Sequence, residues 1–185
     1  MANTIDKEYS STCIINKSKF ISFAYPVSDE QACKDFLQDI RKKYIDATHV
    51  CYGYTLSSPR LDKCSDDGEP SGTAGKPILE LLKKKKLENV LVIVVRYFGG
   101  KKLGAGGLIR AYTNSAKLVV DNAEVVKQVN FVRLKASVEL SECEKFKNRI
   151  LKFGGKIINV NYIDHAEIEF AVPEDCNEFN DMEVN

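Results

Sequence analysis

The chain has few of the residues from which metal sites and disulfide frameworks are built. Its 185 residues include only two histidines, His49 and His165, and its six cysteines contain no Cys-x-x-Cys pair. These counts disfavour a zinc site, and a disulfide framework is unusual in a chain of this length. We therefore expect reduced thiols and no metal site built from these residues.

Long apolar segments are missing as well. No apolar run approaches the roughly 18 residues that a membrane-spanning helix needs. Residues 1–10 are polar and mixed in charge, unlike a signal peptide. We therefore expect a cytoplasmic protein with no membrane partner.

Acidic residues are absent from one long stretch, although the net charge of the whole chain is only +1. Residues 89–120 contain no Asp or Glu but five bases. Residues 1–130 carry 20 Lys and Arg against 15 Asp and Glu, whereas residues 131–185 carry 7 against 11. The pattern predicts a local basic field in the first part of the chain and an acidic tail at its end.

Apolar periodicity predicts an α+β protein. Apolar alternation or unbroken apolar runs predict strands over residues 12–15, 19–25, 48–56, 90–95, 132–140, 156–163 and 166–172. Helical spacing and capping signals predict helices over residues 28–44, 77–86, 107–122 and 141–153. Ser28 with Gln31, and Ser141 with Glu144, have the spacing of capping boxes.

The pattern changes near residue 130, which predicts two domains, residues 1–130 and residues 131–185. The second domain has the order β-α-β-β and ends in the acidic tail.

Two glycine-rich, charged stretches flank the strand predicted at residues 90–95. The first spans residues 65–77 and the second spans residues 96–112. Glycines bring no side chains to a core, but they let the backbone come close to another molecule. We therefore expect the working surface of the protein in these two stretches.

The second stretch leads from a strand into a helix, where free backbone N–H groups and the helix dipole favour an anion. Standard nucleotide loops are not matched, because Ala105 and Gly106 stand where a phosphate-binding loop needs Lys-Ser or Lys-Thr, and Ile109 replaces the third glycine of a dinucleotide pattern. The alternative is that the glycines serve tight packing and the bases are only solvated. The residues predicted to bind phosphate or nucleic acid are Arg96, Lys101, Lys102, Gly104, Gly106, Gly107 and Arg110.

Three carboxylates lie close together in the first stretch, at Asp66, Asp67 and Glu69. They could hold Mg²⁺ or act as acid and base, they could cap turns, or they could pair with Arg96 or Lys101. His49 and Cys51 lie two residues apart on a strand, too far apart for a nucleophile and its base. The residues expected to line the opposite wall of the site are His49, Asp66, Asp67, Glu69, Thr73 and Lys76.

The same stretches resemble the YigZ/IMPACT family over most of residues 12–125. The motifs that carry the resemblance are INKSKFI at residues 15–21, DATH at 46–49 with Cys51, SDDGEPSGTAGKP at 65–77, VVRYFGG at 94–100, KLGAGGL at 102–108 and RAY at 110–112. The run GGKIIN at residues 154–159 resembles the second domain of YigZ more loosely.

The resemblance implies an amino-terminal α+β domain like domain IV of elongation factor G and a ribosomal small-subunit protein, with its helices on one face of the sheet. It also implies a ferredoxin-like second domain, as in domain V of that factor. Only thirteen residues follow Val172, too few for the helix and strand that would complete such a module. Both relatives contact ribosomal RNA, and the family, which has no established enzymatic reaction, includes a protein linked to translational control.

The favoured hypothesis is an RNA- or ribosome-binding module that acts in translation or its regulation, with a protein partner in translational control as a further expectation. One alternative is a Mg²⁺-dependent enzyme acting on a phosphorylated or nucleotide substrate, with Asp66, Asp67 and Glu69 at the ion. The other is a protein-interaction adaptor without chemistry. Because no nucleophile and base pair is visible, we favour binding over catalysis and expect no resident cofactor.

Overall fold

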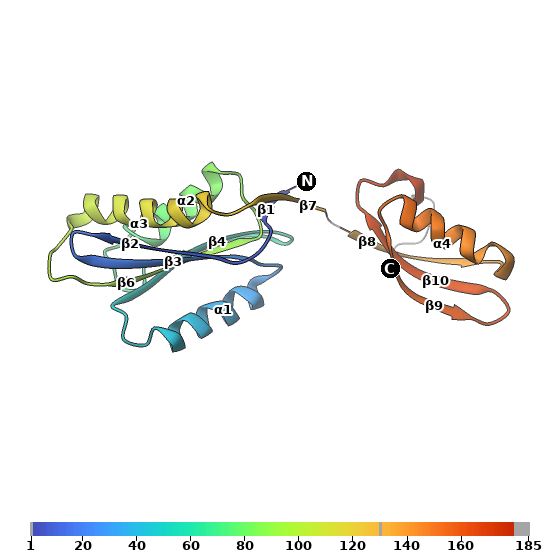
Figure 1. Ribbon diagram of the computed structural model, residues 1–185, viewed down its shortest axis with the longest axis horizontal. Coiled ribbons are helices and arrows are strands. Elements are labelled where there is room, and N and C mark those ends of the chain that lie inside the picture. Colours follow the sequence, from blue (N-terminus) through green and yellow to red (C-terminus); the bar gives the residue numbers. More distant parts are fainter. Residues whose placement is uncertain (1, 130, 180–185) are drawn as a thin grey trace. The chain divides into compact units, whose positions relative to one another are not determined.

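The computed structural model describes residues 2–129 and 131–179. The chain divides into two compact units, residues 2–128 and the residues from Val129 onward (Figure 1). Within the described residues, no helix is both long enough and apolar enough to cross a membrane. All six cysteines are free thiols in the structure.

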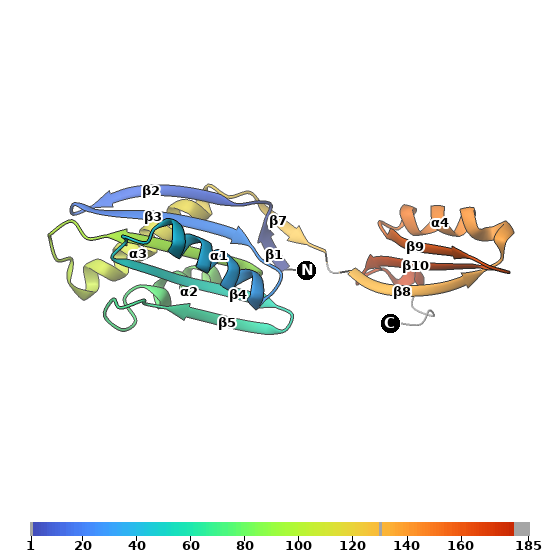
Figure 2. The ribbon, with the colours of Figure 1, turned by 90° about the horizontal axis from the view of Figure 1, so that it is seen from below.

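The larger unit is built on a five-stranded antiparallel sheet with the strand order β2-β3-β6-β4-β5 (Figure 2). Its strands are β2 (Tyr9–Ile15), β3 (Ser18–Pro26), β4 (His49–Ser57), β5 (Arg60–Ser65) and β6 (Val90–Tyr97). The apolar run predicted at residues 90–95 forms the central strand, β6. Two further strands, β1 (Ala2–Ile5) and β7 (Val125–Gln128), pair in a small separate sheet.

Helices cover both faces of the five-stranded sheet. α2 (Gly75–Lys84) and α3 (Gly104–Asp121) lie on one face, and α1 (Glu30–Lys43) lies on the other (Figure 1). The expectation that the helices share one face is therefore wrong.

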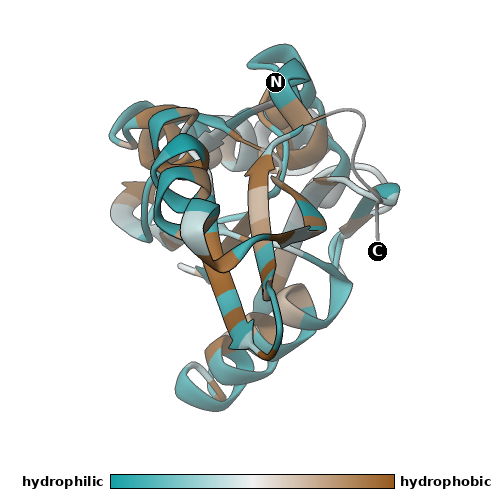
Figure 3. Cartoon of the chain, turned by 90° about the vertical axis from the view of Figure 1, so that its right-hand side faces the viewer, coloured by the Kyte–Doolittle hydropathy of each residue, from teal (hydrophilic) through white to brown (hydrophobic). Residues whose placement is uncertain are grey.

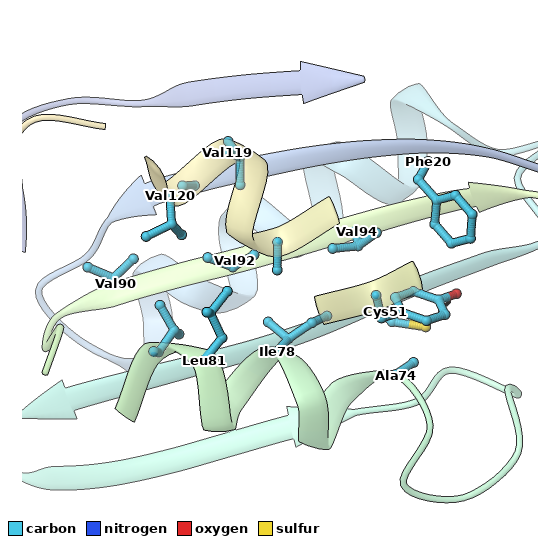
Figure 4. Packing of buried hydrophobic residues seen from close by; sticks show 14 of the residues in the cluster. Phe20, Cys51, Ala74, Ile78, Leu81, Val90, Val92, Val94, Val119 and Val120 are labelled. Carbon is cyan, nitrogen blue, oxygen red and sulfur yellow. Dashed lines mark hydrogen bonds between the residues drawn. The ribbon is translucent and has the colours of Figure 1, made fainter. Parts of the chain in front are cut away.

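The sequence of β6 gives the physical reason for this arrangement. Val90, Val92 and Val94 belong to the core beneath α2 and α3 (Figure 4), whereas the residues between them belong to the core beneath α1. A strand that is apolar on both sides is stable only when both sides are covered.

Several element ends differ from the predicted ones. The carboxylate of Asp29 caps α1 by accepting a hydrogen bond from the backbone N–H of Ala32 at 2.8 Å, so the predicted cap at Ser28 is wrong by one residue. Residues 60–65, for which the sequence predicted no strand, form the edge strand β5 beside β4. α3 begins at Gly104 instead of near Gly107, so Gly104, Gly106 and Gly107 lie inside its first turn.

The smaller unit has the β-α-β-β order predicted from its sequence. It consists of β8 (Phe131–Val138), α4 (Cys143–Lys152), β9 (Lys156–Tyr162) and β10 (Ala166–Pro173), and the antiparallel sheet has the order β8-β10-β9. Hydrophobic and hydrophilic residues alternate along its strands (Figure 3), so that one face of the sheet builds a core with α4. The predicted cap at Ser141 is wrong, because Ser141 lies in a 3₁₀ turn, η1 (Leu140–Glu142), ahead of α4.

Beyond β10, the described residues form one short 3₁₀ turn, η2 (Asn177–Phe179). Phe179 is buried there, and its ring meets those of Phe146 and Phe170 edge to face at 6.0 and 5.3 Å. Up to residue 179, no second helix or fourth strand completes a ferredoxin-like module, and the Phe179 ring contributes to the core instead. The last two acids of the predicted tail, Asp181 and Glu183, lie outside the described residues.

Candidate functional site

Asp66 organises the first glycine-rich stretch. Its carboxylate accepts hydrogen bonds from the backbone N–H groups of Gly72, Ala74 and Gly75 at 2.8 to 2.9 Å. Burial acts to raise the pKa of Asp66, but these three donors outweigh burial and hold the pKa below its usual value. The carboxylate therefore fixes the loop at the start of α2.

Asp67 attaches the same stretch to β4. Its Oδ2 accepts a hydrogen bond from the backbone N–H of Val50 at 2.7 Å, and its Oδ1 lies 3.3 Å from the guanidinium of Arg41. The carbonyl oxygen of Asp67 lies 2.8 Å from Nδ1 of His49. Thr73 is buried in the same stretch, and its hydroxyl donates to the carbonyl of Pro70 at 2.6 Å.

Glu69 and Arg96 form a buried ion pair between the two glycine-rich stretches. The Glu69 carboxylate accepts from Arg96 Nη1 at 2.5 Å and from the Tyr112 hydroxyl at 2.8 Å. Arg96 Nη2 also donates to Ser18 Oγ at 3.2 Å. This is the pairing that the sequence offered as one of three roles for the acids.

Arg96 must therefore be removed from the predicted phosphate-binding surface. Arg96 follows Val95 in β6, and its side chain points to the same side of the sheet as Val94, beneath α3. The Arg96 side chain is therefore only 5% exposed. A guanidinium already paired with Glu69 and enclosed in this way has no free face for a phosphate.

His49 and Cys51 join the edge of this cluster without forming a catalytic pair. His49 Nε2 lies 3.8 Å from the Glu69 carboxylate. The Cys51 thiol lies 3.0 Å from the carbonyl of Asp66 and 3.4 Å from the hydroxyl of Tyr112. Burial raises the pKa of Cys51 to about 12, so the thiol stays protonated at neutral pH and is a poor nucleophile.

The three carboxylates of the first stretch do not converge on one point. Asp66 binds backbone N–H groups, Asp67 binds Val50 and Arg41, and Glu69 is turned inward. The described residues contain no group of three His, Cys, Asp or Glu that could hold a metal ion. The arrangement therefore gives no support to a Mg²⁺ site at these acids, which the sequence left open as one alternative.

The other predicted cations remain at the surface. Lys101, Lys102 and Arg110 are exposed, as are Gly104 and Gly106, whereas Gly107 is half-buried. The first turn of α3 has no acidic residue, and no described side chain caps it. A helix end of this kind is electropositive and leaves backbone N–H groups for other partners.

A groove of about 780 Å³ runs between α2 and α3, and sequence reasoning did not find it. Four lysines line it together with one acid, Glu80, and apolar residues that include Pro77, Leu81 and Ile109. The lysines are Lys76, Lys84, Lys85 and Lys117. The missing information was that α2 and α3 are neighbours on one face of the sheet, which the sequence of neither helix reveals.

Most of the lysines and arginines in and near this groove form no ion pair with a described residue. Lys85 pairs with Asp121 at 2.5 Å, and Lys83 next to the groove pairs with Asp62. Six others form no ion pair with any residue that the structure describes, and all six belong to α2, α3 or the loop before α3. We call these six the basic surface: Lys76, Lys84, Lys101, Lys102, Arg110 and Lys117.

Comparison with known proteins gives one consistent result. Residues 16–120 match the Impact N-terminal domain, which is more than half of the chain. The chain is 37% identical to the IMPACT family member YvyE of Bacillus subtilis, over 96% of this chain and 83% of that protein. It is 31% identical to YigZ of Escherichia coli, over 86% of this chain and 79% of that protein.

One solved structure agrees with these matches. A crystal structure described only as a hypothetical protein is similar to this chain with a TM-score of 0.72 at 28% identity, over 93% of this chain and 85% of that one. A weaker likeness, with a TM-score of 0.40 and 25% identity over 66% of this chain and 47% of the other, is to Yih1, a two-domain translational regulator. The resemblance seen in the sequence is confirmed: this chain belongs to the IMPACT family.

Proposed function

We propose that the larger unit binds RNA, alone or within the ribosome, through the basic surface, and that this binding acts in translation or its regulation. The observation that carries the proposal is the gathering of unpaired cations on one side of the unit. Lys76, Lys84 and Lys117 line the groove between α2 and α3, and the other three lie just before α3 or in its first two turns. Repeated lysine and arginine side chains of this kind bind a phosphate backbone and release its counterions.

The buried ion pair has a supporting role in this proposal. Arg96 and Glu69 join β6 to the first glycine-rich stretch, and Tyr112 ties the same carboxylate to α3. These contacts tie the two glycine-rich stretches, one ending in the first turn of α2 with Lys76 and the other containing Lys101, to each other and to α3. Fixed cations lose less conformational entropy when they bind a phosphate than mobile ones do.

The role in translation comes from the family resemblance seen in the sequence, as do the expected likenesses to domains IV and V of elongation factor G. A protein partner in translational control is a further part of the proposal. A shared fold links this chain to translation only by association. The experiments therefore test RNA binding first.

The salt dependence of RNA binding tests the proposal. If about four phosphates contact the basic surface on a single strand, a plot of log affinity against log salt concentration has a slope of about −3. Raising salt from about 50 to 200 mM then weakens binding on the order of fifty-fold. Binding is measured by fluorescence anisotropy with labelled RNA and, separately, by cosedimentation with ribosomes.

Charge reversal locates the contact. The double variant Lys76→Glu with Lys117→Glu is expected to weaken binding and to bring the slope closer to zero by about 1.4, the share of two phosphates. The control is Lys42→Glu with Lys43→Glu, which makes the same change of charge on α1, on the opposite face of the sheet. Equal losses in both double variants, or binding that salt leaves unchanged, would contradict the proposal.

The two alternatives from the sequence are left with less support. A Mg²⁺-dependent enzyme would need the acids of residues 66–69 to meet at one ion, and each of them has another partner. A protein-interaction adaptor stays a prediction, and a pulldown with the charge-reversal variants tests it.

A further inference from the structure

We propose that Phe98 is a stacking site for an unpaired nucleic-acid base. The proposal rests on the proposed RNA-binding function and deepens it, because it names single-stranded RNA as the class of ligand. Phe98 follows β6 directly and lies at the start of the loop that carries Lys101 and Lys102.

The Phe98 ring lies at the end of a column of side chains that begins in the core. The guanidinium carbon of Arg96 lies 5.6 Å from the ring centroids of both Phe98 and Phe20. Phe20 is fully buried, and its ring meets that of Tyr112 edge to face at 5.4 Å. Because Arg96 is itself held by the carboxylate of Glu69, the column is anchored at its inner end.

The backbone around Phe98 is held as well. The N–H of Phe98 donates to Thr48 Oγ1 at 3.0 Å, and the N–H of Gly99 donates to Ser18 Oγ at 3.3 Å. Gly99 packs so closely on the β2–β3 turn that a Cβ atom there would lie 2.0 Å from the carbonyl oxygen of Lys17. A ring fixed in this way loses little further freedom when a base stacks on it.

The exposure of the ring is what points to a ligand. Phe98 is 46% exposed, and among the described residues of the larger unit it is the one exposed aromatic side chain. Three exposed lysines lie close to it along the chain or across the Gly99 contact, namely Lys17, Lys101 and Lys102. An aromatic face with cations around it suits a base together with its phosphates.

The same geometry favours single strands over duplexes. A stacking ring needs the free face of a base, and in a duplex each base face is covered by its neighbours. An acidic peptide would use the lysines but would have no need of the ring. The structure therefore favours an unpaired base as the occupant.

The first experiment compares affinities for an oligoadenylate of about 12 nucleotides, a duplex of equal length, and an abasic oligomer with the same number of phosphates. Phe98→Leu is expected to weaken binding of the oligoadenylate about 5- to 150-fold, the range that one base stack is worth, and to leave binding of the abasic oligomer unchanged. Phe98→Trp keeps an aromatic ring and is expected to keep or improve the affinity. The matched control is Phe131→Leu, which removes a ring that is 39% exposed and has the Lys156 ammonium 4.9 Å above it, in the smaller unit.

A second measurement uses the absence of tryptophan from the chain. In Phe98→Trp the new indole is the only one, so its fluorescence reports on position 98 alone. Oligoadenylate is expected to quench it, and the abasic oligomer is not. Thermal unfolding of each variant shows whether the fold is intact.

The outcomes separate the two proposals. If the natural chain binds none of the three probes, the proposed RNA-binding function fails and this inference falls with it. If the chain binds all three with a steep salt dependence, but Phe98→Leu changes nothing and the indole is not quenched, the function stands and the stacking site is refuted. Tighter binding of the duplex than of the oligoadenylate would also overturn the stacking proposal.

Discussion

Arg96 and Glu69 place two opposite charges where almost no water reaches them, with side chains 5% and 3% exposed. Removing both groups from water is unfavourable, and the pair is retained only because each satisfies the other and because Tyr112 and Ser18 add hydrogen bonds. The Nε atom of Arg96 is buried and has no partner among the described residues. The pair therefore fixes how these side chains are arranged but adds little to the free energy of unfolding.

Breaking this pair from one side is predicted to destabilise the larger unit strongly. Arg96→Met leaves the Glu69 carboxylate buried without its cation, and Glu69→Gln leaves the guanidinium without its anion. Each change is expected to lower the free energy of unfolding by about 3–5 kcal/mol. The double variant is expected to lose clearly less than the sum of the two, because neither unpaired charge remains.

Urea unfolding of the two single variants and the double variant gives the coupling energy. Losses that simply add would contradict the buried pairing, since residues that do not interact contribute independently.

From the sequence alone, Arg96 and Glu69 could be identified as candidate site residues, but their surroundings in the fold could not be predicted. It offered pairing with Arg96 as one role for the acids, but it also left them open as metal ligands. Choosing between these roles requires the contact between Glu69 and Arg96, which are 27 residues apart, and the cover that α3 provides over both. Periodicity along one segment carries neither piece of information.

The glycines of the helices and strands serve different purposes. Gly53 lies on β4 beneath α2, and a Cβ atom there would come within 2.9 Å of the backbone nitrogen of Leu79. Gly106 lies in the first turn of α3, where a Cβ atom would meet only the end of the Arg110 side chain at 3.8 Å. The fold therefore requires glycine at residue 53 but not at residue 106.

Alanine at these two positions is predicted to have opposite effects on stability. Gly53→Ala forces α2 away from the sheet and is expected to cost about 1–3 kcal/mol, as overpacking does. Gly106→Ala is expected to stabilise α3 by up to about 0.5 kcal/mol, because glycine is a poor helix former. Urea unfolding measures both changes, and a large loss from Gly106→Ala would show that the glycine is needed for packing after all.

Prediction from sequence succeeded best for elements whose periodicity is strong. The alternation in β8 and the unbroken run of β6 each gave the correct strand. It failed at Ser28 and Asp29, two adjacent residues that can both cap a helix, where the choice depends on which side chain faces Ala32. It also missed β5, because that strand lies at the sheet edge and has few apolar residues.

At the scale of the whole molecule, the two units have separate cores. Ile78 is fully buried between α2 and the five-stranded sheet, and Ile150 is fully buried between α4 and the three-stranded sheet. The units also differ in charge, since residues 1–130 have an excess of bases and residues 131–185 an excess of acids. Separate cores give each unit the means to unfold independently.

Two matched substitutions test this independence. Ile78→Ala and Ile150→Ala each remove the same atoms from a fully buried site and are expected to cost about 2–5 kcal/mol in the unit that contains them. In differential scanning calorimetry, the chain is expected to unfold in two transitions. Each variant should lower the temperature of only one transition, and a common shift of both would contradict independent units.

The same calorimetric experiment, repeated with RNA present, also tests which unit binds RNA. A ligand that binds only the folded form of one unit stabilises that unit alone. Because all six residues of the basic surface lie in the larger unit, single-stranded RNA is expected to raise only the transition that Ile78→Ala lowers. A rise confined to the transition that Ile150→Ala lowers would place the RNA contact on the smaller unit, whose residues carry more acids than bases, and the basic surface would lose its assigned role.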